Sequence, residues 1–177
     1  MRDIKDIKAP FLDEEIETLN AGDVALISGV IYTGRDAAHK RMVEMLERDE
    51  DMPFDFSGQA IYYAGPSPSP PGYVIGSIGP TTSGRMDAYT PILMEKGLKV
   101  MIGKGRRDQQ VIESIVKHKG VYFAAIGGAA ALMSKCVKSA EIVAFEDLGT
   151  EAIRKLTVEK LPVIVVVDSK GNNAYKI

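Results

Sequence analysis

The run DVALISGVIYTG at residues 23–34 constrains the fold of this chain more than any other segment. Its apolar and β-branched residues occupy both odd and even positions, which is typical of a strand buried on both faces. Such a strand needs packed layers on either side of its sheet. The chain is therefore predicted to contain an internal sheet rather than a sheet with one face in water.

Segments with strand and helix character alternate along the rest of the chain. Further strands are predicted at 60–64, 73–79, 98–103, 121–127, 141–145 and 163–168. Helices are predicted at 13–23 (ending in a turn), 35–50, 85–97, 107–118, 128–137 and 150–157. This alternation indicates an α/β fold with a mostly parallel sheet and flanking helices, and the strand-rich first half favours a layered β/β/α arrangement. We expect a single domain over 1–177, with 1–10 as a loose N-terminal arm and a turn at 169–172 before a short terminal strand.

Composition excludes several classes of function. The formal net charge of −2 provides no overall basic field, so binding to nucleic acid is not expected. The cysteine Cys136 and the histidines His39 and His118 are too few for this chain alone to hold an iron–sulfur cluster or a structural zinc. No apolar run approaches the roughly 20 residues of a membrane span, and the charged N-terminal segment does not resemble a signal peptide. We expect a cytoplasmic protein that binds anions through local clusters of cations.

The segment GPTTSGRMDAYTP, residues 79–91, is the strongest candidate for such a cluster. It follows a predicted strand and leads into a predicted helix, whose first N–H groups favour a bound carboxylate or phosphate. Thr81, Thr82 and Ser83 supply hydroxyls, and the planar guanidinium of Arg85 can hold a carboxylate through two hydrogen bonds. The alternative interpretation is an ordinary Ser/Thr helix cap beside a surface arginine.

Two other segments occupy the same position between a strand and a helix. TGRDAAHKR places Arg35 at a helix start with His39 one turn later, and IGKGRRDQQ places Lys104 between two glycines. The alternative interpretation of the first segment is a solvated helix face, and that of the second is a tight turn with a solvated lysine. In a parallel sheet, such loops meet at the carboxyl edge, so Arg35, Arg85 and Lys104 are predicted to form a pocket for a small dicarboxylate.

These segments resemble signature segments of a known family. SGVIYTGRDAAHKR, YYAGPSP, IGSIGPTTSGRMD, IGKGRRD and AAIGGAAAL are similar to the C-terminal domain of class I fumarases, which also occurs as the β subunit of L(+)-tartrate dehydratase. The resemblance covers nearly the whole chain, from about residue 10 to the end. It implies the swivelling β/β/α fold.

The resemblance also implies a reaction, a cofactor and a partner. The reaction is the reversible hydration of fumarate to (S)-malate, and a [4Fe–4S] cluster would be carried by a partner α subunit in an α2β2 assembly. Arg35, Arg85, Lys104 and Thr82 would bind substrate, while Thr81 would act as base beside cations that stabilise its alkoxide. Asp36, His39 and Asp87 would support these residues, with Asp36 orienting Arg35 or Arg85. Thr82 remains the alternative base.

Two other functions fit the same residues. The chain fits a β subunit of L(+)-tartrate dehydratase equally well in chemistry, because tartrate also carries two carboxylates. From a different class, it fits a stand-alone dicarboxylate-binding module without catalysis, although a pure binder does not need both threonines beside Arg85. Alone, the chain is expected to lack activity and to be capable of forming a homodimer.

Overall fold

The computed structural model describes residues 3–126 and 130–176. The strands are β1 (Ile4–Lys8), β2 (Val24–Thr33), β3 (Ala60–Tyr62), β4 (Val100–Gly103), β5 (Val121–Ala125), β6 (Val137–Ala144) and β7 (Ile153–Val167). The α-helices are α1 (Asp13–Glu17), α2 (Asp36–Glu47), α3 (Thr90–Glu95), α4 (Gln109–His118) and α5 (Ala130–Lys135). Short 3-10 helices are η1 (Ser83–Met86), η2 (Glu146–Glu151) and η3 (Ala174–Lys176).

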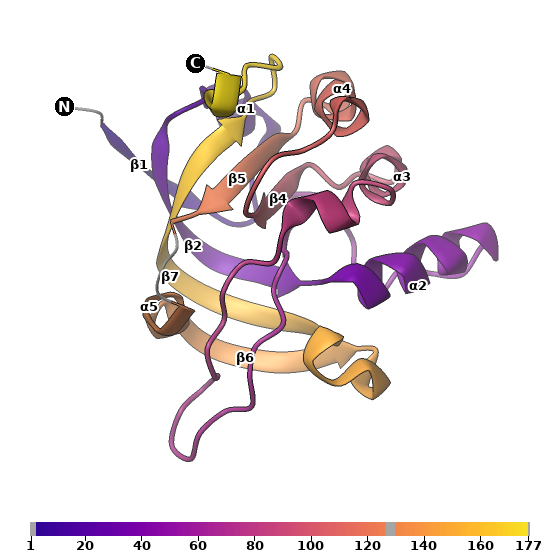
Figure 1. Cartoon of the computed structure of the whole chain (residues 1–177), viewed down its shortest axis with the longest axis vertical. Helices are drawn as coiled ribbons and strands as arrows, with labels where there is room; N and C mark the ends of the chain where they lie inside the picture. Colours follow the sequence, from indigo (N-terminus) through magenta and orange to yellow (C-terminus); the bar gives the residue numbers. More distant parts are fainter. Residues whose placement is uncertain (1–2, 127–129, 177) are drawn as a thin grey trace.

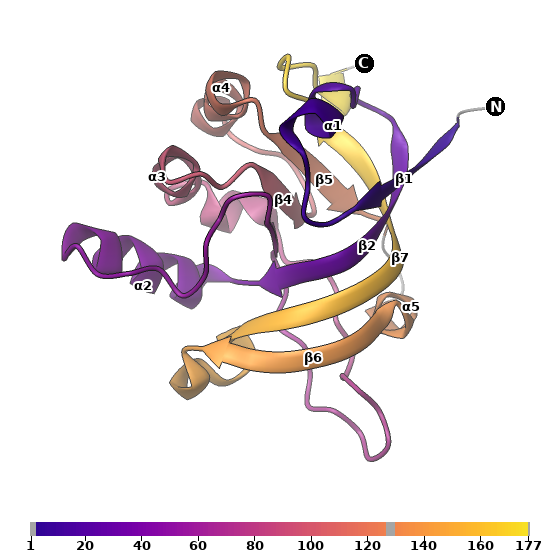
Figure 2. The same cartoon turned by 180° about the vertical axis from the view of Figure 1, so that it is seen from behind.

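The strands form one sheet of mixed direction, in the order β1-β2-β3-β4-β5-β7-β6. Neighbours from β1 to β5 pair in parallel, as predicted for most of the sheet. The long strand β7 runs antiparallel to its neighbours β5 and β6 and also pairs with β2. This extra pairing joins β2 and β7 and closes a ring of β2, β3, β4, β5 and β7 (Figures 1 and 2).

Successive side chains along β3, β4 and β5 point to opposite faces of the sheet and contribute to two separate hydrophobic cores. Ala60, Val100 and Phe123 face a core shared with β1, β2 and β7, whereas Ile61 and Met101 face a second core. The second core is completed by residues of α2, α3 and α4, which lie together on one side of the molecule (Figure 1). The strands β3, β4 and β5 therefore lie between a strand layer and a helix layer, which explains their apolar residues on both faces.

The helices nearest the candidate site agree with the sequence pattern. The predictions at 35–50 and 107–118 correspond to α2 and α4. The predicted helix at 128–137 corresponds in part to α5: residues 128 and 129 lie outside the described ranges, and Val137 already belongs to β6. The predicted helix 85–97 is split, because η1 ends at Met86 and α3 begins only at Thr90, one residue before a proline. No helix in the described part of the chain has the length and apolar character needed to cross a bilayer.

Four further predicted segments differ from the structure. Residues 4–8, expected within a loose arm, form β1, because Ile7 is buried and the strand pairs with β2. The predicted helix 150–157 is wrong; residues from Ile153 onward pair with β2 and β6 on both sides. The predicted strand 73–79 is wrong, since this segment folds back on Ser67 as an irregular loop. The terminal strand after 169–172 is instead η3.

Candidate functional site

The segment Thr81–Ser83 lies at the carboxyl ends of β3 and β4. The Thr81 N–H donates to the Tyr63 carbonyl over 2.6 Å, and the Ser83 N–H donates to the Lys104 carbonyl over 2.9 Å. Thr82 and Lys104 form a parallel bridge. The segment thus becomes the neighbour of β4 where β3 ends, which is the type of opening at strand ends where α/β ligand sites form. It reaches this position without the strand at 73–79 that the sequence analysis predicted.

The three hydroxyls of this segment have different surroundings. Ser83 is buried, and its Oγ lies 2.8 Å from the Tyr122 hydroxyl. A Cβ atom at Gly103 would approach the same Oγ to 2.0 Å, so only glycine leaves room for the serine there. Thr81 is half-buried and Thr82 is exposed. Of the three, the two threonines are therefore the hydroxyls available to a ligand.

Arg85 and Lys104 present cations beside the threonines. The Arg85 N–H donates to the Thr82 carbonyl, which fixes Arg85 one turn of η1 after the threonine. Both side chains are exposed, and within residues 3–126 and 130–176 neither forms an ion pair. Cations without a carboxylate partner are available to bind an anionic ligand. The structure thus brings Thr81, Thr82, Arg85 and Lys104 together through backbone contacts.

Arg35 approaches this group from α2. Its side chain packs against Gly65, where an added Cβ would lie 3.0 Å from the Arg35 Cδ. Gly65 is two residues beyond Tyr63, whose carbonyl accepts the Thr81 N–H. The Arg35 Nε is buried, has no hydrogen bond and lies 3.9 Å from Glu151 Oε1. No contact joins the Arg35 side chain to Arg85 or Lys104 in the described structure.

The residues predicted to support the site have distinct contacts. His39 is buried, and its Nδ1 lies 2.8 Å from the Arg35 carbonyl, so that nitrogen must carry the proton and donate. Burial lowers the pKa of His39 to about 4, which keeps the ring neutral. Asp36 has a buried Oδ1 without a hydrogen-bond partner and forms no ion pair within the described ranges. Asp87 pairs with Arg107, with 2.6 Å between Oδ1 and Nε.

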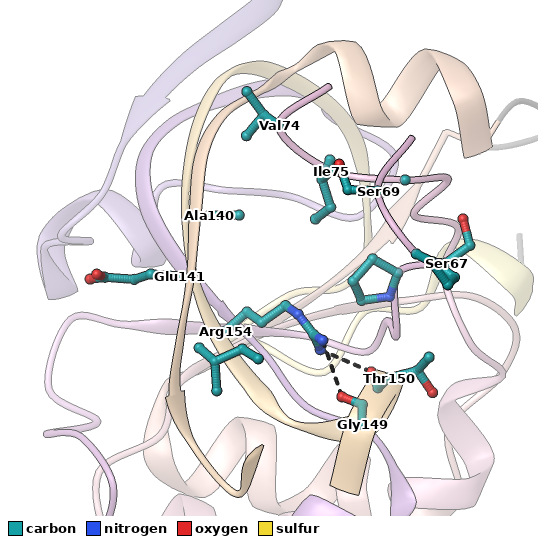
Figure 3. Close-up of a pocket in the computed structure, with 13 residues that line it drawn as sticks. Ser67, Ser69, Val74, Ile75, Ala140, Glu141, Gly149, Thr150 and Arg154 are labelled. Carbon is teal, nitrogen blue, oxygen red and sulfur yellow. Dashed lines mark hydrogen bonds between the residues drawn. The ribbon is translucent and has the colours of Figure 1, made fainter. Parts of the chain in front are cut away.

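A pocket of about 390 Å³ is lined by Pro66 and Thr150, which are neighbours of Gly65, the residue against which Arg35 packs. It is lined mainly by the loop 66–76, β6 and the end of η2. Arg154 extends along it and donates to the Gly149 and Thr150 carbonyls (Figure 3). The residues that line it do not include Thr81, Thr82, Arg85 or Lys104. Its arginine is already occupied by backbone carbonyls, so the threonines and their cations remain the better candidate site.

Sequence reasoning missed three residues around the site. Arg107 and Tyr122 contact the candidate loops from inside the core, and Glu151 lies near Arg35. No sequence signal identified Arg107, because the sequence does not reveal which arginine of the Arg106-Arg107 pair faces the core. Glu151 had no signal either, since residues 150–157 were predicted to be helical.

No three His, Cys, Asp or Glu side chains gather within 3–126 and 130–176 in a way that would hold a metal ion. Cys136 is half-buried, and its Sγ lies near the carbonyls of Leu132 and Lys160. Burial raises the pKa of its thiol, which disfavours the thiolate form that a metal requires.

The geometry defines an α/β domain that gathers hydroxyls and cations at the carboxyl ends of parallel strands. The chain belongs to the family described as the fumarase C-terminus, whose model matches residues 2–177.

Individual relatives agree with this family. The chain is 43% identical over 152 residues to "Fumarate hydratase class I, anaerobic" of Escherichia coli, covering 85% of the chain and 28% of that protein. It is 38% identical over 174 residues to "Fumarate hydratase 2" of Leishmania major, covering 96% of the chain and 31% of that protein. It is also 38% identical over 169 residues to "Putative L(+)-tartrate dehydratase subunit beta" of Methanocaldococcus jannaschii, covering 92% of the chain and 87% of that protein. The chain thus spans about a third or less of the fumarate hydratases but most of the tartrate dehydratase subunit.

Proposed function

We propose that this chain is the β-type component of a hydro-lyase that interconverts fumarate and (S)-malate together with an α-type partner. One observation carries the proposal: the bridge between Thr82 and Lys104, which holds two available hydroxyls beside cations that form no ion pair with any described residue. The family match and the names of the relatives support the reaction class. The short span relative to the fumarate hydratases, and the subunit naming of the relative of similar length, support a separate partner.

The residues of this chain divide the work of binding and proton transfer. Arg35, Arg85 and Lys104 bind the substrate carboxylates, and Thr82 adds a hydrogen bond. Thr81 takes the proton from the carbon next to a carboxylate when malate is dehydrated. A threonine hydroxyl is a weak base, so the two cations next to it must stabilise its alkoxide. The acid that assists the departing hydroxide comes from the partner.

The [4Fe–4S] cluster that the family resemblance implies belongs to the partner in this proposal. In this proposal the part of the present chain is carboxylate binding and proton removal, and its described residues include no group of side chains arranged to hold a metal ion. We further propose an α2β2 assembly in the cytoplasm, in which this domain swivels against the α subunit. In the absence of the partner, the chain is inactive and capable of pairing as a homodimer.

A tartrate dehydratase is the second candidate function. The observation that favours it is the relative from Methanocaldococcus jannaschii, of which this chain covers 87%. The loops around Thr81 and Lys104 would bind the carboxylates of tartrate as well as those of malate. Discrimination between the substrates would then depend on contacts to the additional hydroxyl.

The test is anaerobic co-expression with a candidate α-type chain, followed by assays of fumarate hydration and L(+)-tartrate dehydration. Activity that needs both chains supports the proposal, and the faster reaction identifies the substrate. A stable complex that is inactive on both substrates would contradict both hydro-lyase functions. If no complex forms and the isolated chain binds fumarate, a binding module without catalysis becomes the better interpretation.

Site variants then test the assigned roles. Lys104→Ala should raise KM for the dicarboxylate on the order of ten-fold or more, since a charge-assisted hydrogen bond contributes about 1.5–3 kcal/mol. Thr81→Ala should reduce kcat on the order of 100-fold or more with a smaller change in KM. Arg48→Ala is the control for loss of a surface cation, because Arg48 is exposed and its ion pair among the described residues is with Glu50. Wild-type kinetics for Lys104→Ala would remove the proposed carboxylate site.

A further inference from the structure

The Arg107 side chain is completely enclosed beside the candidate site, although its neighbour Arg106 is exposed. Its Nε donates to Asp87 Oδ1 over 2.6 Å, and its Nη2 donates to Thr90 Oγ1 over 2.8 Å. The guanidinium lies 5.2 Å from the centre of the Tyr63 ring and 4.8 Å from that of Tyr122. A buried charge with a paired carboxylate and two aromatic faces is costly to assemble, which indicates a specific role.

Asp87 connects this arginine to both loops of the site. The carboxylate lies at the end of η1, two residues after Arg85. Its Oδ1 accepts from Arg107, while its Oδ2 accepts the Asp108 N–H over 2.8 Å. Asp108 is the N-cap of α4, so the turn that carries Arg85 is attached to the segment that joins Lys104 to α4.

Tyr122 connects the same two loops at a second point. Its hydroxyl lies 2.8 Å from the Gly105 carbonyl and 2.8 Å from Ser83 Oγ. A carbonyl can only accept, so the single phenol proton goes to Gly105 and the Ser83 hydroxyl is the group left to donate to the phenol oxygen. Burial raises the pKa of Tyr122, and this keeps the phenol protonated. Gly105 follows Lys104, and Ser83 follows Thr82.

We propose that Tyr122 and Arg107 are positioning residues that fix Thr81 and Thr82 relative to Lys104 without contacting the substrate. This inference rests on the proposed hydro-lyase function and deepens it. Thr82 and Lys104 are exposed and belong to loops, so their own packing does not fix the distance between hydroxyl and ammonium. The Tyr122 and Asp87–Arg107 contacts fix the two loops from beneath, and the Arg107–Asp87 and Tyr122–Ser83 bonds are buried, where water competes little.

Tyr122→Phe in the α–β complex tests the proposal, because it removes one oxygen and leaves the ring against Arg107. We expect kcat to fall on the order of 10- to 100-fold while KM changes less than about three-fold, as expected for misplaced reacting groups. Ile27→Val is the control; it removes one buried methylene from the other core, away from both loops, and should leave kcat unchanged. A fall in kcat for Ile27→Val equal to that for Tyr122→Phe would show only general destabilisation and overturn the proposal.

A double-mutant cycle with Ser83→Ala separates positioning from general loss. If the bond between Ser83 and Tyr122 transmits the effect, the fold-loss in kcat of the double variant is clearly smaller than the product of the single losses. A double variant that loses the full product would overturn the proposal, because the two hydroxyls would then act independently.

Hydrogen exchange of the full chain tests the positioning role of Tyr122 without an activity measurement. Tyr122→Phe should speed exchange of the peptide that contains the Thr81 and Ser83 amides, and Ile27→Val should not. If wild-type complexes prove inactive on both substrates, the proposed function fails, while this measurement still tests the positioning role of Tyr122. Unchanged exchange at Thr81 and Ser83 in Tyr122→Phe would overturn that role.

Discussion

His39 shows how a single residue near the site links burial to pH. Its ring is fully buried against Tyr63, with 5.3 Å between the ring centres, and its Nε2 has no partner in the described structure. Burial opposes the charged form and lowers the pKa of His39 from 6.5 to about 4, while the nearby Arg107 acts in the same direction. The neutral ring donates from Nδ1 to the Arg35 carbonyl, which places it directly under a proposed substrate-binding residue.

The lowered pKa predicts a loss of stability at mildly acidic pH. Between pH 6.5 and about 4 the unfolded chain binds a proton that the folded chain does not, so the free energy of unfolding falls as pH falls. From pH 7 to pH 5 this contribution is about 2 kcal/mol. The asparagine of His39→Asn can still donate to the Arg35 carbonyl but does not titrate. From pH 7 to pH 5, the free energy of unfolding of this variant should therefore fall by about 2 kcal/mol less than that of the wild type. Equal pH dependence of both proteins in urea unfolding would contradict the prediction.

A substitution at Gly103 is expected to lower the stability of the chain. A Cβ there would lie 2.0 Å from Ser83 Oγ and 2.7 Å from Tyr63 Cδ2, so Gly103→Ala forces β4 and the threonine segment apart. Overpacking of this kind typically costs about 1–3 kcal/mol, which we expect as a lower denaturant midpoint. Gly84→Ala is the control, because its Cβ would meet only the Arg106 carbonyl, at 4.0 Å. Equal midpoints for the two variants would mean that the strand end accommodates the methyl group.

At the scale of elements, β1 makes a testable contribution that the sequence did not reveal. Ile7 is 4% exposed and Ile4 is 60% exposed, although both belong to the same strand beside β2. Ile7→Ala should lower the free energy of unfolding by about 2–4 kcal/mol, whereas Ile4→Ala should change it by about 0.5 kcal/mol or less. Urea unfolding of the two variants measures this difference. Similar small effects would show that β1 is a loose arm, as residues 1–10 were expected to be.

Elements with a strong local pattern were predictable from the sequence. The helices α2 and α4 and the strand β4 each carry their own hydrophobic period, and their predicted ranges lie within three residues of the observed ends. The first half of β7 was not predictable, because its partners in β2 lie more than a hundred residues earlier in the chain. Pairing over that separation outweighs local propensity.

Some features of the candidate site were likewise predictable from the sequence, and others were not. The loops at Thr81 and Lys104 were predicted to meet at a sheet edge, and their backbones do meet there. The predicted strand before Thr81 does not exist; backbone bonds to Tyr63 and Lys104 hold the segment instead. The burial of Arg107 was not predictable, since the sequence does not reveal which arginine of an adjacent pair faces the core. Only the fold, which places Asp87 and two tyrosines around it, decides this.

For the whole molecule, the exposure of the site predicts weak binding by the isolated chain. Thr82, Arg85 and Lys104 are exposed, and water competes with a ligand for each of them. The net charge of −2 adds no long-range attraction for a dicarboxylate. We therefore expect fumarate at about 10 mM to raise the Tm of the isolated chain by about 1–2 °C or less, since with a Kd of about 10 mM or weaker it stabilises the chain by about 0.4 kcal/mol or less.

The complex should behave differently, because the partner would enclose the same cations and exclude water from them. Fumarate at the same concentration should then raise the Tm of the complex by several degrees, and Lys104→Ala in the complex should lose most of that rise. Arg48→Ala, which removes an exposed cation paired with Glu50, should keep it. An equally large rise for the isolated chain would show that it already contains a complete dicarboxylate site. The chain would then act as a binding module, and its threonines would not need a partner to meet their ligand.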